Sequence, residues 1–124
     1  MGKGGPVAKA EAALAKIGGA SATRHIFICA VSEKQKCCSR ADGKAAWTYL
    51  KKRLKELGLT GRGGTVQRTK ADCLQLCAAG PIAVVWPDNV WYHSMDETGL
   101  EAVIQQHLVG GTPVEAYRLH PRED

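Results

Sequence analysis

Five cysteines in 124 residues are the feature that most narrows what this chain can fold into. Cys29 and the adjacent pair Cys37 and Cys38 form one group, and Cys73 and Cys77 form a second group. Residues 1–23 contain no apolar run typical of a signal peptide, so a secreted disulfide scaffold is not expected. In a reducing compartment, cysteines at this density usually bind metal or do redox work. We therefore expect a soluble cytoplasmic protein built around a cysteine-ligated centre.

Length and composition indicate one globular domain, because 124 residues with 44% hydrophobic residues suit a single core. Residues 1–23 are predicted to be a flexible N-terminal tail, residues 24–111 the domain, and residues 112–124 a C-terminal tail. The formal net charge is +5, but we find no nucleic-acid-binding motif and expect no nucleic-acid partner. No stretch approaches the length of a membrane span.

The N-terminal tail has helical propensity between Ala8 and Ile17, followed by the flexible pair Gly18-Gly19. Two interpretations stay open. The segment is either a frayed tail or a partner-binding or membrane-surface helix with Lys9 and Lys16 on its polar face.

The domain is predicted to contain a strand, a helix, three strands and a second helix, an α/β arrangement. The apolar run His25–Val31 predicts a strand buried on both faces. Asp42 is expected to cap the first helix, and Gly58 is expected to end it. Ser94-Met95-Asp96-Glu97 has the spacing of a capping box for the last helix. A second strand is expected at Thr65–Thr69, and a hairpin of Ile82–Trp86 and Val90–His93 around Pro87-Asp88-Asn89. The last helix is expected to end at Gly110-Gly111. The residues on its apolar face are Leu100, Val103, Ile104, His107 and Leu108.

Both cysteine groups follow strands, and loops that leave the carboxyl ends of strands gather at one edge of an α/β sheet. Thiolates are the soft anionic ligands that iron–sulfur clusters prefer, and a 2Fe–2S cluster takes two of them on each iron. Two cysteines from each loop therefore fit a 2Fe–2S cluster. Whether Cys37 or Cys38 serves is left open by the spacing alone. All-thiolate ligation predicts a low reduction potential.

Other cysteine chemistries fit the pattern less well. Cys73 and Cys77 have zinc-ligand spacing, but Cys29 lies too far from Cys37 and Cys38 for a zinc knuckle. A thiol–disulfide enzyme needs Cys-x-x-Cys at a helix N-terminus, and the sequence has no such motif. No histidine has the Cys-x-His spacing of a Rieske centre; the four are His25, His93, His107 and His120.

The frame of Cys29 and Cys38 followed by Cys73-x-x-x-Cys77, Ala79-Gly80-Pro81, Val84-Val85-Trp86-Pro87-Asp88 and Trp91-Tyr92 resembles the thioredoxin-like 2Fe–2S ferredoxins. It is also similar to the 2Fe–2S subunit of NADH dehydrogenases. The resemblance spans about residues 24–110 and implies a thioredoxin-like sheet of four or so strands flanked by helices. By the same resemblance the ligands of the 2Fe–2S iron are Cys29, Cys38, Cys73 and Cys77, with Cys37 as the alternative to Cys38.

The function expected from this resemblance is that of an electron carrier with no substrate chemistry of its own. Its partners would be a reductase and an acceptor, and the chain would form a homodimer. The hairpin aromatics Trp86, Trp91 and Tyr92 are expected in packing or a dimer interface, with an electron-exit surface beside the cluster as the alternative. The basic run Lys51–Lys55 forms a solvated helix face or docks an acidic partner. Two alternatives stay open: a 2Fe–2S subunit or regulatory cluster module of a larger oxidoreductase, and a structural zinc-binding module.

Overall fold

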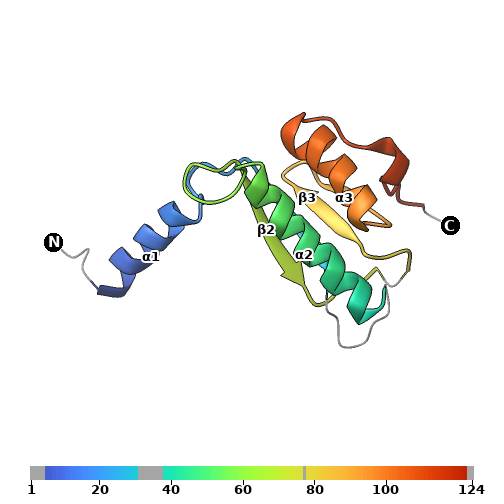
Figure 1. Ribbon diagram of the computed structural model, residues 1–124, viewed down its shortest axis with the longest axis horizontal. Helices are drawn as coiled ribbons and strands as arrows, with labels where there is room; N and C mark the ends of the chain where they lie inside the picture. Colours follow the sequence, from blue (N-terminus) through green and yellow to red (C-terminus); the bar gives the residue numbers. More distant parts are fainter. Residues whose placement is uncertain (1–4, 31–37, 77, 123–124) are drawn as a thin grey trace.

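The computed structural model describes residues 5–30, 38–76 and 78–122. A long helix, α2 (Arg40–Glu56), lies over a sheet beside the shorter helix α3 (Glu97–Val103), while α1 (Gly5–Lys16) projects away from them (Figure 1). The strands are β1 (Arg24–Cys29), β2 (Val66–Ala71), β3 (Ala83–Trp86) and β4 (Val90–Tyr92). A π-helical turn, η1 (Ile104–Val109), continues α3, and a short 3-10 turn, η2 (Glu115–Tyr117), follows. The predicted α/β class and order of elements are confirmed.

The sheet has the order β2-β1-β3-β4, with β1 parallel to β2 and antiparallel to β3. Cys29, the last residue of β1, pairs with Ala71, the last residue of β2. On the other side of β1, Ile28 pairs with Ala83, the first residue of β3. The carboxyl ends of β1 and β2 and the start of β3 therefore meet, and we call this the cysteine end of the sheet.

One face of the sheet carries the main hydrophobic core. The two helices α2 and α3 contact each other and cover this face. All five residues predicted for the inner face of the last helix are buried, because their spacing puts them on one stripe. The core consists chiefly of Ile26, Ile28, Ala46, Leu50, Leu54, Val85, Tyr92, Leu100, Val103 and Ile104.

The opposite face of the sheet is not covered by α2 or α3, which corrects the prediction that the first strand is buried on both faces. His25 and Phe27 point to this face and are half-buried, with their rings stacked at a centroid distance of 4.1 Å. Across the sheet Phe27 pairs with Val84, and Val84 pairs with Trp91. Trp86 is 41% exposed. This uncovered face, defined by Phe27, Val84, Trp86 and Trp91, is therefore apolar and partly open.

The caps of both helices differ from those predicted. Ser39, not Asp42, caps α2, and its hydroxyl accepts a hydrogen bond from the backbone N–H of Asp42 at 3.0 Å. Asp96, not Ser94, caps α3 and accepts from the N–H of Gly99 at 2.9 Å. In each case two polar residues compete within one turn, and the one directly before the first helical residue becomes the cap.

The end of α2 is as predicted. Gly58 has φ +69°, the left-handed conformation that a residue without a Cβ adopts readily. Its N–H bonds to the carbonyl of Lys55, and the N–H of Leu59 bonds to the carbonyl of Leu54 at 2.9 Å. This pair of bonds is a Schellman motif, which satisfies carbonyls that the helix leaves unpaired.

The C-terminal segment packs against its own sheet. The N–H of His93 bonds to the carbonyl of Tyr117 at 3.0 Å, and that of Leu119 bonds to the carbonyl of Trp91 at 2.8 Å. Arg118 forms an isolated bridge with Tyr92. These contacts cover the outer side of β4.

The N-terminal helix α1 has no buried residue, although the chain that follows it is fastened to the domain. The side-chain amide of Gln67 donates to the carbonyl of Ile17 at 2.7 Å, and the Ser21 hydroxyl donates to the carbonyl of Gly64 at 2.6 Å. Gly18 has φ +85°, and a Cβ there would lie 2.2 Å from the carbonyl oxygen of Gly61. The joint therefore fits closely against the Gly61–Gly64 turn while α1 itself extends outward (Figure 1).

No helix in the described part of the chain combines the length and the apolar character that crossing a membrane requires.

Candidate functional site

Cys29 lies at the cysteine end of the sheet, 1% exposed. Its Sγ accepts a hydrogen bond from the backbone N–H of Ile82 at 3.1 Å, and its own N–H donates to the carbonyl of Ile82 at 2.9 Å. Beside it, the N–H of Ala30 bonds to the carbonyl of Ala71 at 3.0 Å. Cys29 is thus fixed between the end of β2 and the start of β3. An N–H group aimed at sulfur stabilises negative charge there, which suits a thiolate ligand.

Cys73 follows β2 by two residues and is exposed. Its Sγ accepts a hydrogen bond from the N–H of Gln75 at 3.2 Å. Gln75 has φ +66°, a left-handed backbone conformation that is uncommon for a residue with a side chain. This backbone turn directs an amide at the sulfur, so two of the predicted ligands each receive an N–H···S hydrogen bond.

Cys38 lies directly before the cap of α2 and is half-buried. The start of a long helix carries partial positive charge from unpaired N–H groups, which also favours an anionic sulfur. In Figure 1, α2 starts near the tip of β2, at the cysteine end of the sheet. The other two cysteines of the predicted set, Cys37 and Cys77, lie outside the described residues.

Three of the predicted ligands, Cys29, Cys38 and Cys73, lie among the described residues. Among residues 5–30, 38–76 and 78–122, no three His, Cys, Asp or Glu side chains lie together in a way that holds a single metal ion. A 2Fe–2S cluster asks for two thiolates at each of two irons, with amides directed at the sulfurs. Of the three predicted ligands among the described residues, Cys29 and Cys73 each receive such an N–H.

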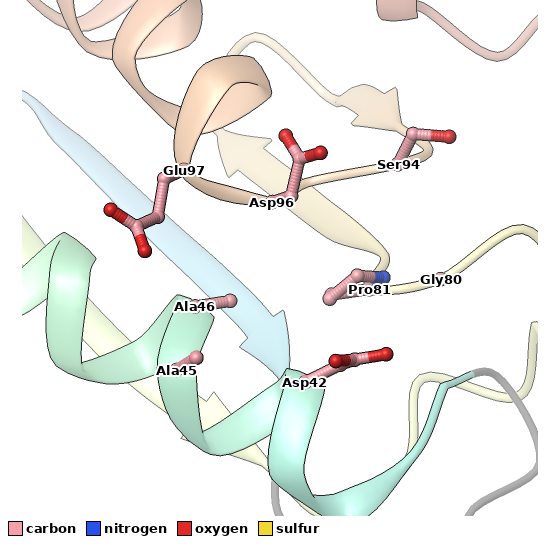
Figure 2. A pocket seen from close by; sticks show the side chains of 8 residues that line it. All are labelled: Asp42, Ala45, Ala46, Gly80, Pro81, Ser94, Asp96 and Glu97. Atoms are coloured by element: carbon pink, nitrogen blue, oxygen red, sulfur yellow. The ribbon is translucent and has the colours of Figure 1, made fainter.

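An acidic cleft beside the cysteine end was not predicted from the sequence. It is a cavity of about 460 Å³ between the first turn of α2, Gly80-Pro81 and the start of α3 (Figure 2). Asp42, Asp96 and Glu97 supply its carboxylates. Three strands separate Asp42 from the adjacent pair Asp96 and Glu97 in the sequence, and each of the three looks like an ordinary first-turn or capping residue. The only signal in the sequence was that two helix starts carry acids.

The opposite end of the sheet holds a buried polar chain that the sequence also did not reveal. His107 is fully buried, and its Nε2 lies 2.6 Å from the carboxylate Oδ2 of Asp88. Its Nδ1 lies 2.8 Å from the hydroxyl of Tyr92, which itself accepts the N–H of Val114 at 3.0 Å. Arg24 donates to the same Asp88 oxygen at 2.9 Å. Hydrogen bonds from Arg24 and His107 hold the pKa of Asp88 below its usual range, against the effect of desolvation.

Each of the four histidines has a hydrogen-bond partner within the described residues. His25 bonds to the Thr69 hydroxyl at 2.8 Å, and burial lowers the pKa of His25. His93 bonds to Ser94 at 2.8 Å, and His120 to Glu115 at 3.1 Å.

The sheet order, the two helices on one face and the cysteines at the strand ends define a thioredoxin-like α/β protein. No protein-family model matches the sequence. Among solved structures, the wild-type thioredoxin-like [2Fe-2S] ferredoxin of Aquifex aeolicus is 25% identical and has a TM-score of 0.66. The match covers 81% of this chain and 99% of that one.

Sequence relatives agree with the structural likeness. A 2Fe-2S ferredoxin of Aquifex aeolicus is 28% identical over 97 residues, which are 74% of this chain and 85% of that protein. A 2Fe-2S ferredoxin of Clostridium pasteurianum is 27% identical over 100 residues, which are 77% of this chain and 94% of that protein. The chain is therefore similar to the thioredoxin-like 2Fe–2S ferredoxins in sequence and in fold. The resemblance predicted from the cysteine frame is confirmed.

Proposed function

We propose that this chain holds one 2Fe–2S cluster and carries single electrons at low potential between redox partners. Its iron ligands would be Cys29, Cys38, Cys73 and Cys77. The observation that carries the proposal is the pair of N–H···S hydrogen bonds, from Ile82 to Cys29 and from Gln75 to Cys73. The relatives are 2Fe-2S ferredoxins, which agrees with the predicted cofactor and function.

When bound, the cluster supplies a site that accepts and releases one electron, and the protein supplies ligands, hydrogen bonds and surroundings. Burial of Cys29 excludes water from one side of the site. The amides of Ile82 and Gln75 offset the negative charge on sulfur, one directly before β3 and the other in the loop after β2.

A visible absorption spectrum of freshly purified protein tests the cofactor. A brown protein that bleaches on dithionite, with about two irons and two sulfides per chain, is expected of a 2Fe–2S centre. A colourless protein with bound zinc would establish the structural zinc module instead. Redox titration of the visible band then tests the low potential.

The choice between the two adjacent cysteines is tested by a matched pair of variants, Cys37→Ser and Cys38→Ser. Since Cys38 directly precedes the cap of α2, we expect Cys38→Ser to lose or alter the cluster and Cys37→Ser to keep it. Loss of the cluster only in Cys37→Ser would reverse the assignment.

We also propose that the chain has no substrate chemistry of its own and works in the cytoplasm with a reductase and an acceptor. A homodimer is supported by the uncovered sheet face, where Trp86 is 41% exposed. Sedimentation of wild type against Trp86→Lys tests this, since a charge on a buried interface should yield monomer.

The alternative role, as a 2Fe–2S subunit or regulatory module of a larger oxidoreductase, is favoured by the outward projection of α1.

A further inference from the structure

One flank of α2 carries a basic stripe, which we define as Lys44, Trp47, Lys51 and Lys55. The spacing of three and four residues places the four side chains on one side of the helix. This side faces β2, because the guanidinium of Arg68 lies 5.2 Å from the centre of the Trp47 ring. The ammonium of Lys51 lies 5.4 Å from the same centre. Two cations therefore lie over one half-buried tryptophan.

The basic stripe differs from the other flank of α2 in how its charges are paired. On that flank Arg53 bonds to Glu101 and Glu56, so its charge is balanced within the protein. Within the described residues no carboxylate lies at ion-pair distance from Lys44, Lys51 or Lys55. The Nε of Arg68 is buried without a hydrogen-bond partner there. The positive charge of the stripe is thus available to a carboxylate from outside.

Basic residues lie close in the sequence to two of the proposed cluster ligands. Lys44 lies in the second turn of α2, the helix that begins just after Cys38. Lys70 is exposed at the end of β2, three residues before Cys73. A partner lying over the stripe and the end of β2 would consequently contact the cysteine end of the sheet, where an electron must enter or leave.

Charge on the far side of the cysteine end has the opposite sign. The acidic cleft of Asp42, Asp96 and Glu97 opens there, between α2 and α3 (Figure 2). An acidic partner is attracted to the stripe and repelled from the cleft, so the two surfaces together fix its orientation. Nucleic acid fits less well, because single-strand binders offer aromatic rings for base stacking and the Trp47 ring already has two cations over it.

We propose that the basic stripe, together with Arg68 and Lys70, is the docking surface for an acidic redox protein that exchanges single electrons with this chain. The proposal rests on the proposed function. It assigns to this surface the encounter with the partner, through long-range attraction and carboxylate contacts, and leaves the cluster ligands untouched.

Binding is tested on the purified holoprotein with a polyglutamate peptide as the acidic probe and an oligothymidylate as the nucleic-acid probe. Tryptophan fluorescence at low ionic strength reports both. The test variant is Lys44→Gln, Lys51→Gln, Lys55→Gln. The matched control, Lys9→Gln, Lys16→Gln, Arg122→Gln, removes the same charge elsewhere. We expect polyglutamate to bind about tenfold more weakly to the test variant and less than about threefold more weakly to the control.

Electron exchange is tested with the anion hexacyanoferrate(III), which takes one electron from the dithionite-reduced protein and becomes hexacyanoferrate(II). Stopped-flow oxidation should slow about tenfold in the test variant at low ionic strength, and the difference should vanish at high salt. The control variant should react at close to the wild-type rate.

Three outcomes would overturn the proposal: equal effects in the two triple variants, electron exchange unchanged in the test variant, or tighter lysine-dependent binding of oligothymidylate than of polyglutamate. An absent cluster is distinguishable from these outcomes. A protein without a cluster would lack the visible absorption band, which would contradict the proposed function. The polyglutamate titration would still show whether the basic stripe binds an acidic partner.

Discussion

Cys29 and Cys73 illustrate how different two cysteines of one proposed site are before any cofactor is considered. Cys29 is 1% exposed and fixed between two strands, whereas Cys73 is exposed in the loop after β2. A thiol reacts only when a reagent reaches it. Both sulfurs nevertheless accept an N–H hydrogen bond, so burial and hydrogen bonding are set independently here.

This difference predicts the order of alkylation in cluster-free protein. We expect iodoacetamide to modify Cys73 at least about tenfold faster than Cys29, because Cys29 requires local opening of the sheet. Peptide mass spectrometry over a time course measures both rates. In denaturant the two rates should converge, which controls for intrinsic reactivity. Equal rates in the folded protein would contradict the burial of Cys29.

Asp88 has a structural task at the other end of the sheet. The carboxylate of Asp88, whose pKa is lowered chiefly by its hydrogen bonds to Arg24 and His107, can only accept, so Nε2–H of His107 donates to it at 2.6 Å. The Tyr92 hydroxyl lies 2.8 Å from Nδ1 of the same ring. We predict that Asp88→Ala lowers the free energy of unfolding by about 1–3 kcal/mol, since it leaves a buried N–H without an acceptor. Urea unfolding at neutral pH measures this loss.

The control for Asp88 is Arg24→Gln, which removes only its more exposed partner. The Arg24–Asp88 pair is partly solvated, with side chains 24% and 31% exposed, so its loss should cost less than about 1 kcal/mol. If Arg24→Gln cost as much as Asp88→Ala, the ion pair rather than the buried histidine would be the important contact.

At the scale of elements, one carboxylate links α2 to α3. Glu101 accepts hydrogen bonds from Arg53 through both of its oxygens, at 2.8 and 2.9 Å, and from the Tyr49 hydroxyl at 2.7 Å. Gln105 adds a fourth bond at 2.9 Å. Arg53 above all, then Gln105 and Tyr49, lowers the pKa of Glu101 to about 2.

The lowered pKa of Glu101 predicts a pH dependence of stability. The folded state favours the ionised carboxyl, so its contribution is complete above the ordinary pKa of 4.5 and is lost as pH falls toward about 2. Glu101→Gln should therefore be less stable than wild type at neutral pH, and the difference should shrink through this range. Thermal unfolding followed from pH 7 to pH 2 measures it.

The control on the same helix is Glu97→Gln. Glu97 is exposed and makes no ion pair among the described residues, so its variant should lower the melting temperature less. A difference between Glu101→Gln and wild type that stayed constant down to pH 2 would show that packing, not charge, accounts for the loss.

The order and type of the elements could be predicted because periodicity reports burial directly. Leu100, Val103 and Ile104 repeat at helical spacing and are buried as expected. The helix caps could not be predicted, because Ser39 and Asp42 are both good capping residues and only their place relative to the first turn decides. Phe27 is only half-buried because α2 and α3 both pack on the opposite face of the sheet, and no local sequence pattern predicts that.

The candidate site divides in the same way. The expected meeting of the two cysteine groups rests on strand ends, which can be predicted from the sequence, and the structure places Cys29 beside Ala71 and Ile82. The acidic cleft and the Arg53–Glu101 contact join residues from different elements. Each of these residues looks like a solvated surface charge when the sequence is read alone, so tertiary structure is needed to find them.

At the scale of the whole molecule, the unusual feature is that α1 has no buried residue, whereas the segment that follows it packs closely against the Gly61–Gly64 turn. All large apolar side chains of α1 and its end are exposed, with Val7, Leu14 and Ile17 between 52% and 58%. The joint after it is held by Gln67 to Ile17 and by Ser21 to Gly64. We therefore expect the stability of the domain to depend on the joint and not on α1.

Two truncations that differ only in the joint test this division. Removing residues 1–16 takes away α1 alone, and we expect the melting temperature to change by less than about 2 °C. Removing residues 1–22 also takes away the two joint hydrogen bonds and should lower the melting temperature by about 4 °C or more. Calorimetry measures both, and size-exclusion chromatography shows whether either cut changes the oligomeric state.

If removing residues 1–16 lowered the melting temperature as much as removing residues 1–22, or converted a dimer to a monomer, then α1 would have a partner surface in solution. In that case its exposed apolar residues would be covered by a second copy of the chain.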